Sequence, residues 1–253
     1  MNERQQKIQS IISEHGEAKL SELEHLFPDI STMTLRRDLK KLEGLGEIVR
    51  TRSGAKSIAY LSRLHEMQYS ERELVSIAEK SFIAQRACRY VSQGSCIFLD
   101  TGTTVTGLAR LLVSDKLFTV TAAPNIALEC AKNQNNTVFM TGGQLSRGNL
   151  SLSGVNALNF LDHINIDVAF MAASGFTFTN GFTCGHFDEC QIKKRIIMKA
   201  AKAIMLMDCS KFGKNHPFTF ADVSDIDLLI TDSSISSEDL KRLQGLGLNV
   251  VWQ

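Results

Sequence analysis

The sequence of 253 residues predicts an α/β protein in two parts: a small helical N-terminal domain that ends in a hairpin, and a larger domain with a mainly parallel sheet. Residues 1–57 carry short amphipathic patterns rich in charge. From residue 74 on, short apolar strands alternate with helical segments, which is typical of a doubly wound, Rossmann-like sheet. Residues 58–73 are polar and lack apolar periodicity, so a linker or the start of a connecting helix is expected there.

Composition sets limits on the class of protein. Hydrophobic residues make up 43% of the chain, and the net charge of +1 means that any patch for nucleic acid must be local. The six cysteines form no CxxC pair and no Cys/His cluster at zinc spacing, so we expect reduced thiols, no metal site and no cofactor. The polar N-terminus argues against a secretory signal, and no apolar run approaches the roughly 20 residues that span a bilayer. A cytoplasmic protein without membrane contact is expected.

Two short helices are predicted at the N-terminus. Isoleucines spaced i, i+3 and i+4 from Ile8 form an apolar stripe, and Gly16 ends that helix. A second apolar face covers Leu20–Phe27. Ser21, with Glu24 three residues later, predicts a capping box at its start.

A third helix begins at Ser31, its predicted N-cap. It is followed by a strand over 48–52, a turn at 53–54 and a return strand over 56–60. The helix has one apolar face, formed by Leu35, Leu39, Leu42 and Leu45. Three helices and a hairpin form the plan of a winged helix-turn-helix.

This segment also carries a local basic patch. Seven basic residues stand against three acidic ones between Ser31 and Lys56. A solvated helix face, or a module for protein interaction, would also have this composition. We favour DNA because hydroxyls and arginines at a helix N-terminus suit phosphates and guanine edges, and because basic residues recur on the hairpin. The predicted DNA contacts are Ser31, Thr32, Thr34, Arg36, Arg37, Lys40, Arg50 and Arg52.

The larger domain is expected to alternate regularly between strands and helices. Its predicted strands cover 96–99, 118–122, 137–141, 168–172, 204–207, 228–231 and 249–252. Its predicted helices cover 74–91, 104–112, 124–133, 155–161, 189–200 and 237–246, and Ser236 is the candidate cap of the last helix.

The stretch Ile97–Thr104 carries the most suggestive chemistry. A buried strand ends in Asp100, and Gly102, Thr103 and Thr104 open a helix. Exposed amides and hydroxyls at a helix N-terminus suit a phosphate or another small anion. A plain βα turn with a threonine cap fits the same residues, and spacing alone does not separate the two interpretations.

Ligands of doubly wound sheets bind at the carboxyl ends of the strands. That rule groups four segments that follow predicted strands: 100–104, 121–125 with Asn125, Gly142-Gly143, and 208–211 with Lys211. Lys211 can meet a phosphate as a point charge, although most lysines are simply exposed.

The run Ser31-Thr32-Met33-Thr34-Leu35-Arg36-Arg37-Asp38-Leu39, with Leu42-Glu43 after it, resembles the recognition helix of DeoR-type transcriptional regulators. Two departures are visible. The chain has an additional residue before Ser31, and it has Arg52-Ser53-Gly54-Ala55 where the family usually has His-Gly-Gly-Ala. The second departure concerns the groove contacts of the wing.

Residues 75–233 resemble the effector domain of the same regulators, which is similar in fold to ribose-5-phosphate isomerase and glucosamine-6-phosphate deaminase. The resemblance implies that Glu189 and Lys193 join the effector site. The isomerases carry an Asp-Gly-Ala-Asp-Glu run after a central strand. The aligned run here, 172–176, is Ala-Ala-Ser-Gly-Phe and lacks a carboxylate. A binding pocket without its general base would result.

The resemblance therefore implies a DNA-binding regulator with no catalytic residues, expected to repress sugar-metabolism genes. Its expected partners are double-stranded operator DNA, a small phosphorylated sugar that releases it, and further copies of itself. The expected division is a DNA-binding domain over 1–57, a linker over 58–73 and an effector domain over 74–253. The alternative is an active sugar-phosphate isomerase or deaminase with an appended basic domain.

Overall fold

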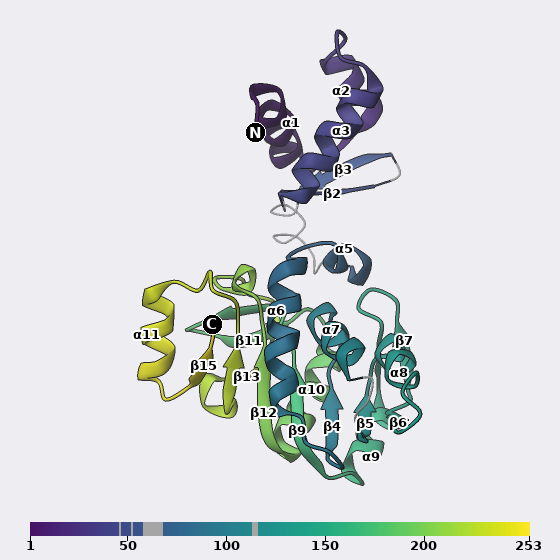
Figure 1. The fold of residues 1–253 in the computed structure, drawn as a ribbon, viewed down its shortest axis with the longest axis vertical. Helices are drawn as coiled ribbons and strands as arrows, with labels where there is room; N and C mark the ends of the chain where they lie inside the picture. The colour runs from purple at the N-terminus through teal and green to yellow at the C-terminus, as the bar shows by residue number, and fades with distance from the viewer. Residues whose placement is uncertain (46, 52, 58–67, 113–115) are drawn as a thin grey trace. The chain divides into compact units, whose positions relative to one another are not determined.

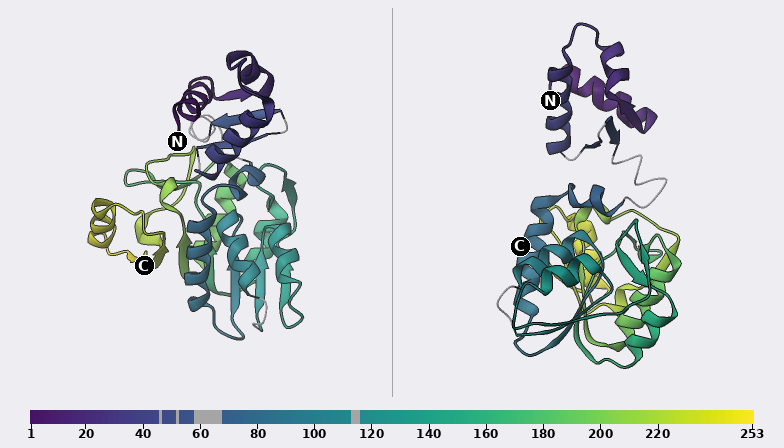
Figure 2. Two further views of the ribbon diagram at one scale, coloured as in Figure 1. Left: turned by 45° about the horizontal axis from the view of Figure 1, so that its top comes forward. Right: turned by 90° about the vertical axis from the view of Figure 1, so that its right-hand side faces the viewer.

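The computed structural model describes residues 1–45, 47–51, 53–57, 68–112 and 116–253. The chain divides into two compact units, Met1–Ser76 and Ile77–Gln253, shown in Figures 1 and 2. None of the described helices has the length and apolar character needed to cross a membrane.

The first unit packs helices against a small sheet. Its helices are α1 (Glu3–His15), α2 (Leu20–Leu26), α3 (Thr32–Gly44) and α5 (Tyr69–Glu73), and its antiparallel strands β1 (Glu17–Lys19), β3 (Gly54–Ser57) and β2 (Ile48–Arg50) pair in the order β1-β3-β2. Ile8, Ile12, Leu23 and Leu35 are fully buried in its core. The predicted winged helix-turn-helix is confirmed.

The helix starts of this unit were predicted with mixed success. Ser31 caps α3 as predicted, because its Oγ accepts the backbone N–H of Thr34 at 3.3 Å. The capping box predicted at Ser21 is wrong: α2 begins directly after β1, and the backbone N–H of Lys19 donates to Glu22 Oε2 at 2.8 Å. Leu45 is also not part of the buried face, because it follows the last turn of α3 and is 53% exposed.

The hairpin differs from its prediction at its second strand. That strand begins at Gly54, since Thr51 and Gly54 close the turn through a 2.9 Å backbone hydrogen bond. Strand β1 was missed because Glu-Ala-Lys has no apolar alternation. Gly46, Arg52, the end of the predicted return strand at 58–60 and most of the predicted linker lie outside the described residues.

The second unit is built on a seven-stranded sheet in the order β15-β14-β12-β9-β4-β5-β6, and every neighbouring pair is parallel. The strands are β4 (Cys96–Leu99), β5 (Phe118–Thr121), β6 (Thr137–Met140), β9 (Ile166–Met171), β12 (Ala200–Leu206), β14 (Leu228–Ile230) and β15 (Asn249–Val251). The predicted α/β class with a mainly parallel sheet is confirmed, and so is the position of each predicted strand to within a few residues.

Helices cover both faces of this sheet (Figure 1). One face carries α6 (Ile77–Ala87), α7 (Thr103–Leu111) and α8 (Pro124–Cys130); the other carries α9 (Val155–Asp162), α10 (Phe187–Lys199) and α11 (Ser237–Gly245). The described residues of this unit also form short 3-10 helices, η1 (Cys88–Tyr90), η2 (Cys209–Lys211) and η3 (Val223–Asp225). The predicted helix from residue 74 starts later, at Ile77, because Leu74 ends α5 and Ser76 has a φ of 51°.

Two small antiparallel sheets were not predicted. Strands β7 (Gln144–Ser146) and β8 (Ser151–Ser153) form a hairpin after β6, and β10 (Gly175–Thr177), β11 (Gly181–Cys184) and β13 (Phe218–Ala221) form a three-stranded sheet. Each of these strands has only three or four residues, too few to show a period.

Candidate functional site

The side chain of Asp100 lies at the carboxyl end of β4 and is only 1% exposed. Its Oδ1 accepts the backbone N–H of Thr101 at 2.8 Å, and its Oδ2 accepts the backbone N–H of Ala172 at 2.9 Å. Lys193 Nζ donates to the same Oδ2. Asp100 therefore links the ends of the neighbouring strands β4 and β9 to helix α10.

Lys193 projects from α10 and is completely enclosed. Besides Asp100, its ammonium group contacts the carbonyl oxygen of Ala172 at 2.9 Å and Glu189 Oε1 at 3.1 Å. It also lies 5.2 Å from the ring centre of Phe220, a cation–π distance. Residues 189 and 193 are one helical turn apart, which places both on the face of α10 that meets the sheet.

These charges shift one another's pKa values. Burial lowers the pKa of Lys193, but the attraction of Asp100 and Glu189 outweighs burial, so this pKa lies above its usual value. Burial raises the pKa of Asp100, Lys193 opposes that rise, and Glu189 adds to it. The buried group thus contains two carboxyl groups and one ammonium, and its lysine stays charged at neutral pH.

Glu189 also connects this cluster to the β7–β8 hairpin. Asn149 Nδ2 donates to Glu189 Oε2 at 2.5 Å, and Ser151 Oγ donates to Asn149 Oδ1 at 2.8 Å. On the other side, Thr101 Oγ1 donates to Glu189 Oε1 at 3.4 Å. Sequence reasoning missed Asn149, because it lies in the unpredicted hairpin and nothing in its local sequence signals burial.

The predicted anion turn forms the start of α7. Gly102, with a φ of 140°, precedes the helix, and its carbonyl accepts both the backbone N–H and the Oγ1 of Thr106 at 2.9 Å. The backbone N–H groups of Thr103 and Thr104 precede this first intrahelical hydrogen bond. They therefore have no acceptor within the helix and can donate to another group. Asn125, at the start of α8, donates to Thr106 Oγ1 at 3.2 Å and so joins the two helix starts.

Gly142 and Gly143 have a conformational role in the structure. They follow β6 with φ values of 72° and 106°. A Cβ on Gly143 would lie 2.2 Å from the carbonyl oxygen of Ser153, so only glycine lets the β7–β8 hairpin close at this point.

A second charged cluster follows β12. Asp208 is 1% exposed and accepts the backbone N–H of Ser210 at 3.0 Å. Burial raises its pKa, but Lys211, Ser210 and Lys80 together hold that pKa below its usual value. Burial and the charge of Lys211 lower the pKa of Lys214. Three lysines thus act on one carboxylate, and only Lys211 was predicted. The role of Lys80 was not predicted, because a lysine within a helical pattern is usually exposed to solvent.

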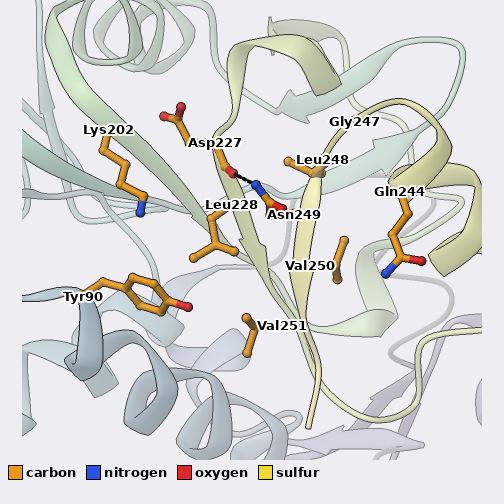
Figure 3. A pocket seen from close by; sticks show the side chains of 10 residues that line it. All are labelled: Tyr90, Lys202, Asp227, Leu228, Gln244, Gly247, Leu248, Asn249, Val250 and Val251. Atoms are coloured by element: carbon orange, nitrogen blue, oxygen red, sulfur yellow. Dashed lines mark hydrogen bonds between the residues drawn. The ribbon is translucent and has the colours of Figure 1, made fainter.

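A hollow among the described residues lies away from this end of the sheet. It has a volume of about 510 Å³ and lies where β14 and β15 begin (Figure 3). Tyr90, Lys202 and Asn249 are among the residues that line it, and Asn249 Nδ2 donates to the carbonyl oxygen of Asp227 at 3.4 Å. None of the predicted site residues lines this hollow.

In the first unit, α3 presents its basic side chains to solvent. Arg36, Arg37 and Lys40 are exposed, whereas Asp38 between them is 2% exposed. Asp38 accepts Arg4 Nε at 2.6 Å and Gln5 Nε2 at 2.8 Å, both from α1. The Arg-Arg-Asp triplet therefore combines an outward basic pair with an inward anchor that fixes α3 to α1.

The other predicted DNA contacts have partners of their own. Thr32 Oγ1 donates to Glu24 Oε1 at 2.6 Å, and the guanidinium of Arg50 meets Glu43 at 2.7 Å. The hydroxyls of Ser31 and Thr34 lie 3.0 Å apart at the start of α3. Arg52 is outside the described residues.

Comparison with known proteins agrees with both units. The DeoR-like helix-turn-helix domain matches residues 4–60, and the DeoR C terminal sensor domain matches residues 75–233. The uncharacterised HTH-type transcriptional regulator YulB of Bacillus subtilis is 34% identical over 96% of this chain and 93% of its own length. The HTH-type transcriptional regulator GlpR of Haloferax volcanii is 32% identical over 98% of this chain and 96% of its own.

Among solved structures, ribose 5-phosphate isomerase A of Methanocaldococcus jannaschii covers 53% of each chain at 19% identity, with a TM-score of 0.40. The two domain matches and the near full-length relatives carry the assignment. The chain belongs to the DeoR family of helix-turn-helix transcriptional regulators.

Proposed function

We propose that this chain is a cytoplasmic repressor of sugar-metabolism genes that binds operator DNA as a homo-oligomer and is released by a phosphorylated sugar. The observation that carries the proposal is the buried Asp100–Lys193–Glu189 cluster at the carboxyl ends of the strands, in a domain of the sensor family. Two relatives point the same way: one is named a putative aga operon transcriptional repressor and another the transcriptional repressor GlcR.

In this proposal α3 enters the major groove. Arg36 and Arg37 read base edges or phosphates, and Lys40 contacts the backbone. Residues 1–57 are the DNA-binding part, and residues 74–253 the sensing part. The salt bridge between Arg50 and Glu43 would have to open before Arg50 reaches a phosphate.

The effector is held at the carboxyl edge of the sheet. Its hydroxyls meet Glu189 and Asp100, and its phosphate meets the α7 amides at Thr103 and the charge of Lys211. Binding shifts the population towards an arrangement with lower DNA affinity, by no more than the difference in effector affinity between the two arrangements.

Enzymatic turnover is the competing function, and the structure at Ala172 bears on it. The backbone N–H of Ala172 donates to Asp100, and its carbonyl accepts Lys193. The run Ala172–Phe176 itself has no carboxylate, so the general base that the isomerases carry on this segment is absent from it. We therefore propose binding without catalysis.

The test uses the full chain and duplexes selected from a random library. We expect selected DNA to bind with a steep salt dependence, and one of ribose 5-phosphate, glucose 6-phosphate, fructose 1-phosphate and glycerol 3-phosphate to release it and raise the melting temperature. Inorganic phosphate and the unphosphorylated sugars are the controls. Turnover of a sugar phosphate that disappears in Glu189→Gln would refute the repressor-only function, and the absence of selected DNA would refute the DNA-binding function.

A further inference from the structure

Strand β6 is one edge of the seven-stranded sheet. Among the described residues it pairs with β5 alone, from Phe118↔Thr137 to Thr121↔Met140. The backbone N–H groups of Thr137 and Thr141 donate to β5, at 2.9 Å and 3.1 Å. Because the direction of the N–H alternates along a strand, the backbone N–H and C=O groups of Val138 and Met140 point outward, along the free edge.

This edge is apolar on both faces of the sheet. Phe139 pairs in register with the buried Val120, so its ring is on the α9–α10 face, and it is 39% exposed. Phe118 is on the same face of the neighbouring strand and is 44% exposed. Met140 is on the opposite face and is 49% exposed. An aromatic pair and a methionine thus flank an open row of backbone groups.

The edge also lacks the devices that keep edge strands apart. Proteins usually protect such strands with a charge, a proline or a bulge. From residue 133 to residue 146 the sequence has no charged residue and no proline. The pairing of β6 with β5 runs without a bulge. An edge of this kind is stable in solution when another strand covers it.

We propose that β6 of one copy pairs antiparallel with β6 of a second copy, around a twofold axis at Phe139. The axis is perpendicular to the sheet, so each face continues into the same face of the partner. Val138 then lies opposite the partner's Met140 and exchanges both backbone hydrogen bonds with it. Phe139 meets the partner's Phe139 as a non-hydrogen-bonded pair, whose side chains lie closest.

Two features favour a second copy as the occupant. A twofold axis brings every residue near its own copy, so a charged edge would repel itself, and this edge has no charge. The outward backbone groups of the two copies are also complementary. A twofold axis at residue 139 places residue 138 of one copy opposite residue 140 of the other, and both residues have their N–H and C=O groups on the free edge.

The exposed apolar area is adequate for the centre of such an interface. At roughly 200 Å² for a large side chain, Phe118, Phe139 and Met140 each leave about 80 to 100 Å² exposed. Together this is about a third of the roughly 800 Å² that each partner buries in a standard interface. The inference rests on the proposed homo-oligomer, and it names the surface that joins two copies.

The first test is a cross-link in the full chain. In Phe139→Cys the two thiols meet at the axis, and we expect diamide to link most of the chains into a covalent dimer mapped by mass spectrometry to position 139. In the matched control Thr137→Cys, the side chain is on the same face of the same strand, but the two copies are about four residues, or roughly 13 Å, apart along the strands. This control should not cross-link.

The second test removes the pairing. Met140→Pro deletes an outward N–H and leaves the ladder to β5, so light scattering should report half the assembled mass of the wild type. Met140→Leu keeps the N–H and should keep the mass. If circular dichroism shows that Met140→Pro does not fold, the cross-linking experiment alone tests the interface. An assembled wild type that gives no selective cross-link overturns this interface alone. A monomeric wild type overturns the proposed homo-oligomer with it.

Discussion

Replacing Lys193 by methionine tests whether its charge holds the site together. The ammonium contacts two carboxylates and one carbonyl, and its side chain is 2% exposed. Methionine keeps most of the volume but leaves Asp100 and Glu189 buried without a cation. Breaking a buried ion pair on one side costs about 3–5 kcal/mol. We therefore expect Lys193→Met to lose about 4 kcal/mol of unfolding free energy near pH 7.5.

The loss should depend on pH in a defined direction. Burial already raises the pKa of Asp100 in the native protein, and removing the lysine raises it further. A carboxyl group whose folded pKa exceeds its unfolded value contributes stability when it is protonated, and that stability disappears as pH rises through the folded pKa. The deficit of Lys193→Met relative to wild type should therefore shrink between pH 7.5 and pH 5.

Urea unfolding followed by fluorescence measures this quantity in the second unit. Trp252, the single tryptophan of the chain, packs against the core cluster of that unit. The control is Lys194→Met, an exposed neighbour on α10, which should stay within about 0.5 kcal/mol of wild type. The double variant Asp100→Asn/Lys193→Met should recover part of the loss. A deficit below about 1 kcal/mol, or one that does not change with pH, would refute the ion-pair reasoning.

Three further predictions concern the remaining functional residues. Arg36→Ala and Arg37→Ala should weaken operator binding, at least one of them by about 1–3 kcal/mol in a footprinting titration, and normal affinity in both would exclude α3 as the reading helix. Thr103→Val removes a hydroxyl at the start of α7 and keeps the backbone amide; it should keep DNA affinity but blunt release by the effector in the same titration, and an unchanged release curve would remove this hydroxyl from the site. Asp38→Asn should cost about 2 kcal/mol at neutral pH by thermal unfolding. Arg4 and Gln5 outweigh the effect of burial and hold the pKa of Asp38 below its usual value, so its contribution is complete above about pH 4 and fades as pH falls through the folded pKa. The variant should therefore lose less stability than wild type below pH 4, and parallel curves would contradict this.

The sequence predicted those parts of the fold that local chemistry determines. Ser31 and Ser236 cap their helices through their own hydroxyls, three residues from the amide that they accept. Strand β4 was predicted to the residue, because its apolar run ends abruptly at Asp100. The resemblance brought Glu189 and Lys193 to the site, and the structure places both in contact range of each other.

What the sequence did not predict depends on tertiary contacts. Asn149 reaches Glu189 only because the β7–β8 hairpin folds back over α10, and Lys80 acts on Asp208 only because α6 packs against the sheet. Asp38 looked like one more charge on a basic helix until α1 supplied Arg4 and Gln5. Ser21 failed as a cap because the preceding strand places the cap of α2 at Lys19, two residues earlier.

In the proposed effector site, the two charged clusters would contact different parts of a phosphorylated ligand. The Asp100–Lys193–Glu189 group has carboxyl oxygens to which sugar hydroxyls can donate hydrogen bonds. The group around Asp208 has three lysines, Lys80, Lys211 and Lys214, for one carboxylate, a balance that favours an anion. Strand β9 alone separates β12 from β4, so the carboxyl ends of these two strands lie about 10 Å apart across the sheet. On this proposal a sugar phosphate would contact both clusters, and a ligand that lacks either its phosphate or its hydroxyls would lose the contacts of one of them.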